Sequence, residues 1–164
     1  MSSSATLLNA RLGECLSDME LSPAARLGGG WSVELPSLKR GSVGVGLLAR
    51  ERTVRMATFF MRAPDRDHVS VYRRLLERNL QMTYWRFGID ADGDLFLAAH
   101  LDDEQLSAAS LDAVLGLLVT YIDESYETIL RLGFDVPAHI RVVAPPLDHD
   151  AWGPRGDAPV PGEA

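Results

Sequence analysis

The amino-acid sequence predicts an α+β fold, in which helices pack on an antiparallel sheet of five strands. One observation is that segments with the period-two alternation of strands follow one another through short turns, as they do in antiparallel sheets. The other is that three further segments repeat their apolar residues at helical spacing. The expected order of elements is α-β-β-β-α-β-β-α. A doubly wound nucleotide-binding fold would instead alternate strands with helices along the chain.

The N-terminal part of the chain predicts one helix and two strands. Apolar side chains recur at helical spacing over residues 5–19, and Ser4 is placed to cap this helix. After three glycines, residues 31–35 alternate as a strand that we expect to stop at Pro36. A short turn then leads into a second strand. The apolar side of that strand consists of Val43, Val45, Leu47 and Ala49.

The middle of the chain predicts a third strand and a second helix. Residues 53–61 are rich in β-branched and aromatic side chains, which is typical of strands. A helix is expected from about residue 68 to residue 80, with Asp65 or Asp67 placed to cap its start. We expect the apolar residues of this helix to form a single stripe. They are Val71, Leu75, Leu76 and Leu80.

Two strands and a long helix complete the expected fold. The strands cover residues 84–89 and 95–101, and a hairpin turn of Asp and Gly residues at 90–94 joins them. The final helix is capped by Ser107 and ends at Gly133, which we place in the left-handed position that follows a helix. The side of the two strands that faces the helices consists of Trp85, Phe87, Ile89, Leu95, Leu97, Ala99 and Leu101.

The composition favours a single domain in the cytoplasm. A chain of 164 residues suits one domain, which we expect over residues 1–143, followed by a flexible Pro- and Gly-rich tail over residues 144–164. Cys15 is the only cysteine, so an internal disulfide is impossible and a reducing compartment fits. No apolar run approaches the roughly 20 residues that cross a bilayer, and no secretory signal is recognisable. Membrane association is therefore not expected.

The charge balance argues against nucleic acid as a partner. The net charge is −7 and the pI is near 5.0, whereas phosphate binding requires a basic surface. Residues 50–86 contain nine Arg and four acidic residues, and residues 87–130 contain ten acidic residues and no Lys or Arg. The two segments either neutralise each other on the folded surface or form opposed patches that steer partners or self-association.

No pattern of residues predicts a catalytic, cofactor-binding or metal site. Asp90, Asp92 and Asp94 resemble the start of a calcium-binding EF-hand loop. Leu95 and Leu101, however, stand where such a loop requires Gly and a bidentate Glu, so we expect a hairpin turn. The four histidines lack the spacing of a helical metal site, and the glycine clusters lack the other residues of a phosphate loop. No cofactor is therefore expected.

Residues 72–79 read Tyr-Arg-Arg-Leu-Leu-Glu-Arg-Asn, and further characteristic segments lie at 87–97, 110–112 and 121–134. Together they resemble the YbjN family, most closely its actinobacterial branch. The likeness covers about residues 60–134. It implies a fold similar to that of type III secretion chaperones. It also implies a protein-binding or regulatory module without enzymatic activity, since some members are labelled sensory-transduction regulators.

The leading functional hypothesis is a non-enzymatic, chaperone-like module that binds a protein. The alternatives are a small-molecule sensor and an enzyme whose site is assembled from residues distant in sequence. A protein partner or self-association is expected, and a homodimer is one form that the self-association could take.

The candidate partner surface is the sheet face turned away from the helices. On the last two strands its residues include Tyr84, Arg86, Phe96 and His100, a mixture unlike the charged surface of an ordinary solvent face. One possibility is that the first helix or the tail covers this face. The other is that a protein contacts it, either a second copy of the chain or a client segment.

Overall fold

The computed structural model describes residues 3–25 and 29–135 of the chain. The expected end of the domain at residue 143 and the tail expected over residues 144–164 lie outside these residues. The described elements follow the order α-β-β-β-β-α-β-β-α, with a short 3-10 turn before the final helix. This order confirms the α+β fold class and adds a sixth strand to the five expected.

All six strands belong to one antiparallel sheet with the order β1-β2-β3-β4-β6-β5. The additional strand, β1, is an edge segment of two residues and is therefore too short to show an alternation in the sequence. Strand β5 forms the opposite edge. The strands are β1 (Ala24–Ala25), β2 (Trp31–Ser37), β3 (Gly41–Arg50), β4 (Thr53–Met61), β5 (Arg86–Ile89) and β6 (Leu95–Asp102).

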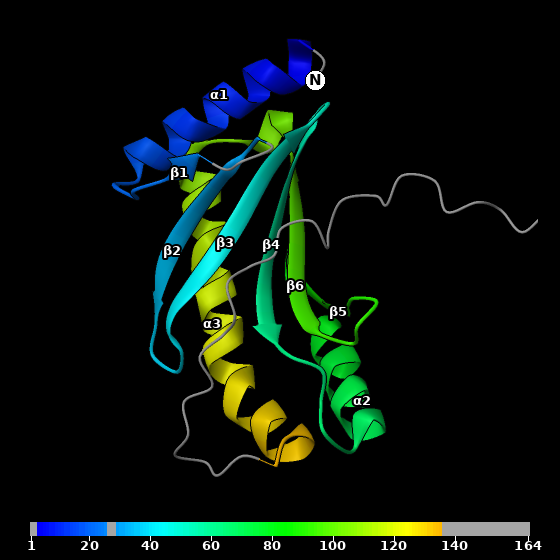
Figure 1. The fold of residues 1–164 in the computed structure, drawn as a ribbon. Coiled ribbons are helices and arrows are strands. Elements are labelled where there is room, and N and C mark those ends of the chain that lie inside the picture. The colour runs from blue at the N-terminus through cyan, green and yellow to red at the C-terminus, as the bar shows by residue number, and fades with distance from the viewer. Residues whose placement is uncertain (1–2, 26–28, 136–164) are drawn as a thin grey trace, which may run out of the picture.

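The helices of the described residues pack against this sheet (Figure 1). Helix α3 runs along one face of the sheet, α1 crosses one end of it near β3, and α2 lies beside α3 next to the edge strand β5. None of the helices in the described residues is long and apolar enough to cross a membrane. The helices are α1 (Ser3–Asp18), α2 (His68–Asn79) and α3 (Ala108–Gly133), and the 3-10 turn η1 is Asp103–Gln105.

One hydrophobic core fills the space between the sheet and the helices. The alternating residues expected on the inner sides of β3 and β6 are all buried in it. Trp85, the largest fully buried side chain, donates its indole N–H to the carbonyl of Val114 on α3 at 2.8 Å. This hydrogen bond satisfies the single polar atom of the indole and ties the start of β5 to α3.

Two strands differ from the sequence prediction for local reasons. Strand β2 continues through Pro36 to Ser37, because β1 pairs with only the first two residues of β2 and leaves the rest as an edge that tolerates proline. Strand β5 begins at Arg86, because Tyr84 has a left-handed backbone with φ 64° and cannot extend it. At the other end of β5, Ile89 is 53% exposed, so the prediction that its side chain joins the core is wrong.

The helix caps were predicted in part. Ser107 caps α3 as expected, with its hydroxyl accepting the N–H of Ser110. Asp67 rather than Asp65 caps α2. Ser4 does not cap α1, because that helix already includes Ser3. The hydroxyl of Ser4 instead donates to the backbone carbonyl of Glu51 at 3.0 Å.

Gly133 ends α3, but for a different reason from the one predicted. It is the last helical residue rather than a left-handed residue after the helix. A Cβ at this position would lie 2.8 Å from Cγ2 of Val71 and 3.1 Å from Cβ of Pro64. Its carbonyl accepts the N–H groups of Asp65 and Arg66 at 2.7 and 3.1 Å. Glycine is therefore required because the first turn of α2 and the connection that precedes it pass so close to the helix.

Candidate interaction surface

Helix α2 is held by contacts on its inner side and at its C-terminal end. Val71 and Leu75 are buried in the core that α2 shares with α3. At the end of the helix, the side-chain amide of Asn79 donates to the carbonyl of Phe87 at 3.1 Å and accepts its N–H at 2.7 Å. The amide thus occupies the outer edge of β5 as a neighbouring strand would. It protects an edge that could otherwise pair with another chain.

A second apolar stripe lies on the opposite side of α2, formed by Val69, Leu76 and the C-cap residue Leu80, whose backbone is still helical, and we call it the outer stripe. These side chains are 79%, 65% and 88% exposed. At about 100° per residue they fall within about 40° of one another, and Val71 and Leu75 lie roughly 100–180° away.

The prediction of one stripe on this helix is therefore wrong. Leu75 and Leu76 are adjacent in sequence, and adjacent residues of a helix point in directions about 100° apart. The sequence carries the signal that was missed, because the spacing of seven and four residues from Val69 to Leu76 to Leu80 places all three on one face.

Arg73 and Glu77 flank the outer stripe on one side. Both side chains are exposed, and neither makes an ion pair or hydrogen bond to another side chain in the described part of the chain. An exposed apolar stripe beside one basic and one acidic residue is a surface suited to a protein contact.

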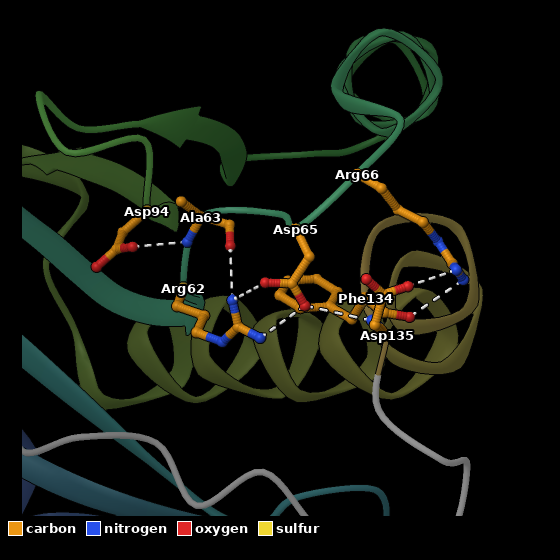
Figure 2. Close-up of polar contacts among 7 residues, drawn as sticks. All are labelled: Arg62, Ala63, Asp65, Arg66, Asp94, Phe134 and Asp135. Carbon is orange, nitrogen blue, oxygen red and sulfur yellow. Dashed lines mark hydrogen bonds and ion pairs between the residues drawn. The ribbon is translucent and has the colours of Figure 1, made fainter.

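A polar cluster fixes the connection between β4 and α2 to the end of α3, as Figure 2 shows. Arg62 makes two hydrogen bonds to Asp65, at 2.5 and 2.8 Å, and its guanidinium carbon lies 4.9 Å from the ring centroid of Phe134. The second carboxylate oxygen of Asp65 also accepts the N–H of Asp135 at 3.2 Å. One carboxylate thus joins the connection to the residues that follow α3.

Arg66 joins the same two segments from the other side (Figure 2). It forms an ion pair with Asp135 at 2.5 Å and donates to the carbonyls of Arg131 and Phe134, both at 3.2 Å. Carbonyls at the end of a helix lack partners within the helix, so a cation there is favourable. The cluster therefore sets where α2 begins relative to α3.

The same cluster shifts the protonation equilibria of its members. The hydrogen bonds from Arg62 and from the backbone of Asp135 lower the pKa of Asp65 to about 2, because they favour the ionised carboxylate. The hydrogen bond to Asp65 in turn raises the pKa of Arg62. Both groups consequently stay charged at neutral pH.

The sheet residues predicted to bind a partner do not form one exposed patch. Phe96 lies on the sheet face turned away from the helices, but it is only 7% exposed. It packs edge to face on Phe59 of β4, with ring centroids 5.5 Å apart. His100 lies further along β6 on the same face and is exposed. The accessible apolar group that Phe96 was expected to provide is therefore missing from this surface.

Tyr84 and Arg86 lie near the edge of the sheet. Tyr84 is 45% exposed but precedes β5. Arg86 is the first residue of β5, and its guanidinium donates to the carbonyls of Met82 and Trp85 at 2.7 and 2.6 Å. These bonds hold the charged group against its own connection. A role in partner binding for Tyr84, Arg86, Phe96 and His100 stays a prediction.

The Asp-rich segment between β5 and β6 forms a hairpin turn stabilised by its own carboxylates. Asp90 accepts the N–H groups of Asp92 and Asp94, both at 2.9 Å. The carboxylate of Asp94 accepts the backbone N–H of Ala63 at 2.6 Å (Figure 2). These carboxylates serve backbone N–H groups, and residues 3–25 and 29–135 contain no group of three side chains placed to hold a metal ion.

The basic and acidic segments meet in the folded chain. Arg52 lies 3.6 Å from a carboxylate oxygen of Asp103 and 2.8 Å from one of Glu104, and Arg78 pairs with Glu124. These pairs favour the interpretation that the two segments partly neutralise each other over the one in which they form opposed patches. Exposed pairs of this kind contribute little to stability, about 0–1 kcal/mol each.

Comparisons with known proteins support the resemblance found in the sequence. The family model described as "YbjN: Putative bacterial sensory transduction regulator" matches residues 41–131. An uncharacterised protein of Mycobacterium leprae is 32% identical over 102 residues, which make up 62% of this chain and 55% of that protein. This chain thus spans about half the length of the curated relatives it matches. The expected actinobacterial likeness is confirmed.

Two solved structures share the fold. The type III secretion chaperone SycH of Yersinia pestis, crystallised with a stable fragment of YscM2, has a TM-score of 0.53 at 18% identity and covers 70% of this chain and 96% of its own. YbjN from E. coli has a TM-score of 0.53 at 14% identity, and the match covers 71% of this chain and 90% of the E. coli chain. The predicted similarity to secretion chaperones in fold is therefore confirmed.

Proposed function

This chain belongs to the YbjN family, and we propose that it acts as a non-enzymatic, cytoplasmic module that binds a protein. The family is described as a regulator, and the chaperone sharing the fold was crystallised with a fragment of another protein. Both facts support a role in binding rather than in converting a substrate. The single cysteine suits a reducing compartment, and the net charge of −7 disfavours nucleic acid as the partner.

The observation that carries the proposal is the outer stripe on α2. A helix on a folded domain normally buries one apolar face and exposes polar residues on the other. Helix α2 buries Val71 and Leu75 and still exposes three large apolar side chains on its other side. Burying a Leu or Val side chain contributes roughly 1.5–3 kcal/mol, so a partner that covers all three gains several kcal/mol before the costs of association.

A second copy of the chain fits this stripe. When two α2 helices pack antiparallel about a two-fold axis at the level of residue 75, each Arg73 lies level with Glu77 of the other copy. Both residues flank the stripe on the same side, so the opposite charges meet twice across the contact. Val69 and Leu80, which lie near the two ends of the stripe, come together in the same arrangement. The proposed contact is therefore a symmetric homodimer.

The test is to replace Leu76 and Leu80 by Glu and to measure molar mass by light scattering. We expect the unmodified chain to have the mass of two copies and the double variant L76E/L80E to have the mass of one. The matched control is Leu7→Glu, because Leu7 is also an exposed leucine on a helix, 66% exposed against 65% for Leu76. It should leave the dimer intact.

A client protein on the outer stripe is distinguished by a pull-down with the same variants. If the unmodified chain is monomeric and L76E/L80E loses a protein that L7E retains, the stripe binds a client and the homodimer is rejected. If L76E/L80E keeps both its mass and its partners, the outer stripe is not the binding surface. Tyr84→Glu tests the sheet edge in the same experiments.

A further inference from the structure

A cleft lies between α2 and α3, away from the outer stripe. Its volume is about 260 Å³. Arg74 and Arg78, one helical turn apart, line it from α2, and Ser125 and Thr128 line it from α3. Leu75 and Ile129 supply apolar surface. None of these residues belongs to the proposed protein contact, so the function of the cleft is a separate question.

Three polar side chains of the cleft have no hydrogen-bond partner among the described residues. The side chain of Arg74 and the hydroxyls of Ser125 and Thr128 make no side-chain hydrogen bond or ion pair in the described residues. Arg78 pairs with Glu124 and donates to Gln81 Oε1 at 3.4 Å, its guanidinium carbon lies 5.5 Å from the ring centroid of Tyr121, and its Nε is buried without a partner. A buried donor without an acceptor is unfavourable, which makes this site unusual within the fold.

We propose that this cleft binds a small oxyanion, either a phosphate or a carboxylate group that carries a short apolar substituent. The guanidinium of Arg74 supplies donors in a planar fork that such groups accept, the hydroxyls of Ser125 and Thr128 add two more donors, and Arg78 adds positive charge. The two Arg and the single acidic group of the lining, Glu124, leave one net positive charge. The volume is somewhat below the roughly 300–1,000 Å³ of pockets for drug-sized ligands, so the ligand is a small molecule.

Glu124 would compete with a bound anion for Arg78, because its carboxylate already pairs with the Arg78 guanidinium. The bound anion connects Arg74 and Arg78 of α2 to Thr128 of α3. It therefore stabilises the packing of the two helices, and ligand binding raises the melting temperature of the chain.

The test measures the melting temperature of the whole chain in inorganic phosphate and, separately, in acetate, with ionic strength held constant by sodium chloride. At a concentration of about ten times the dissociation constant we expect a rise of roughly 2–5 °C. The two probes distinguish the sources of the oxyanion, because only the one that matches the natural ligand class should act at low millimolar concentration.

Arg74→Gln and Thr128→Val should each weaken the apparent affinity, the former about tenfold or more. The control is Arg50→Gln, which removes the same charge from an exposed residue at the end of β3, outside both the cleft and the outer stripe. It should retain the response. The proposal is overturned if neither anion raises the melting temperature, or if R50Q and R74Q lose the response equally, which would show general charge screening. None of these variants changes a residue of the proposed protein contact.

Discussion

Replacing Gly133 by Ala tests the close approach between α3 and the β4–α2 connection. A new Cβ would lie 2.8 Å from Cγ2 of Val71 and 3.1 Å from Cβ of Pro64. Carbon atoms in contact normally stay about 3.5–4.0 Å apart, so the first distance is at least about 0.7 Å too short. The backbone cannot retreat easily, because the Gly133 carbonyl accepts the N–H groups of Asp65 and Arg66.

The expected cost follows from two opposing effects. Forcing an extra methyl group into a packed site costs about 1–3 kcal/mol. Alanine is favoured over glycine inside a helix by up to about 1 kcal/mol, and by less at the last helical residue. We therefore expect Gly133→Ala to lower the free energy of unfolding by about 1–2 kcal/mol, and the melting temperature by roughly 2–8 °C.

The control lies in the same helix. A Cβ on Gly116 would meet no atom within 4 Å, and this residue is exposed. Gly116→Ala should therefore raise the free energy of unfolding by about 0.5–1 kcal/mol. Urea denaturation followed by circular dichroism measures both variants against the unmodified chain. If G133A is as stable as G116A, α2 and its preceding connection do not pass as close to α3 as described, and the explanation for this glycine is wrong.

Two further predictions concern polar contacts that position α2. Asp65→Asn should remove a pH-dependent stabilisation: the folded-state pKa of about 2 lies below the ordinary 3.8, so the stabilisation is present above pH 3.8 and is lost as the pH falls towards 2. In acid denaturation the stability gap between the unmodified chain and D65N should close over that interval, and a gap unchanged at pH 2 would contradict the assignment. Asn79→Ala removes both hydrogen bonds to Phe87 and should lower the free energy of unfolding, measured by urea denaturation, by about 1–3 kcal/mol. Asn79→Asp can still accept the N–H of Phe87 and should cost less. Equal stability of N79A and the unmodified chain would refute the role given to this amide.

The sequence predicted the elements well wherever the period of apolar residues was long. The strand expected at residues 53–61 has these bounds in the structure, and the final helix differs only in the role of its last residue. Such segments bury a whole side of each element, so the alternation is strong. The errors fall where neighbours in space decide. Pro36 continues β2 only because the neighbouring strand β1 is so short, and no local pattern reveals that.

The predicted binding face was harder to obtain from the sequence. Alternation along β6 correctly placed Phe96 and His100 on one side of the sheet. It could not show that Phe96 and Phe59, distant in sequence, pack on each other and are buried together. The α2–α3 cleft was out of reach for the same reason, because Arg74 and Thr128 are brought together only by the packing of two helices.

The segment that carried the family resemblance acquires a physical explanation in the structure. Residues 72–79 form most of α2, and successive positions serve different neighbours. Leu75 enters the core, Leu76 lies in the outer stripe, Arg78 lines the cleft, and Asn79 closes the edge of β5. A helix that only packed on a sheet would constrain one side of its sequence. In α2 the core contact and the Asn79 bonds to β5 already constrain two parts of the sequence, and the two proposed contacts would constrain the remaining sides.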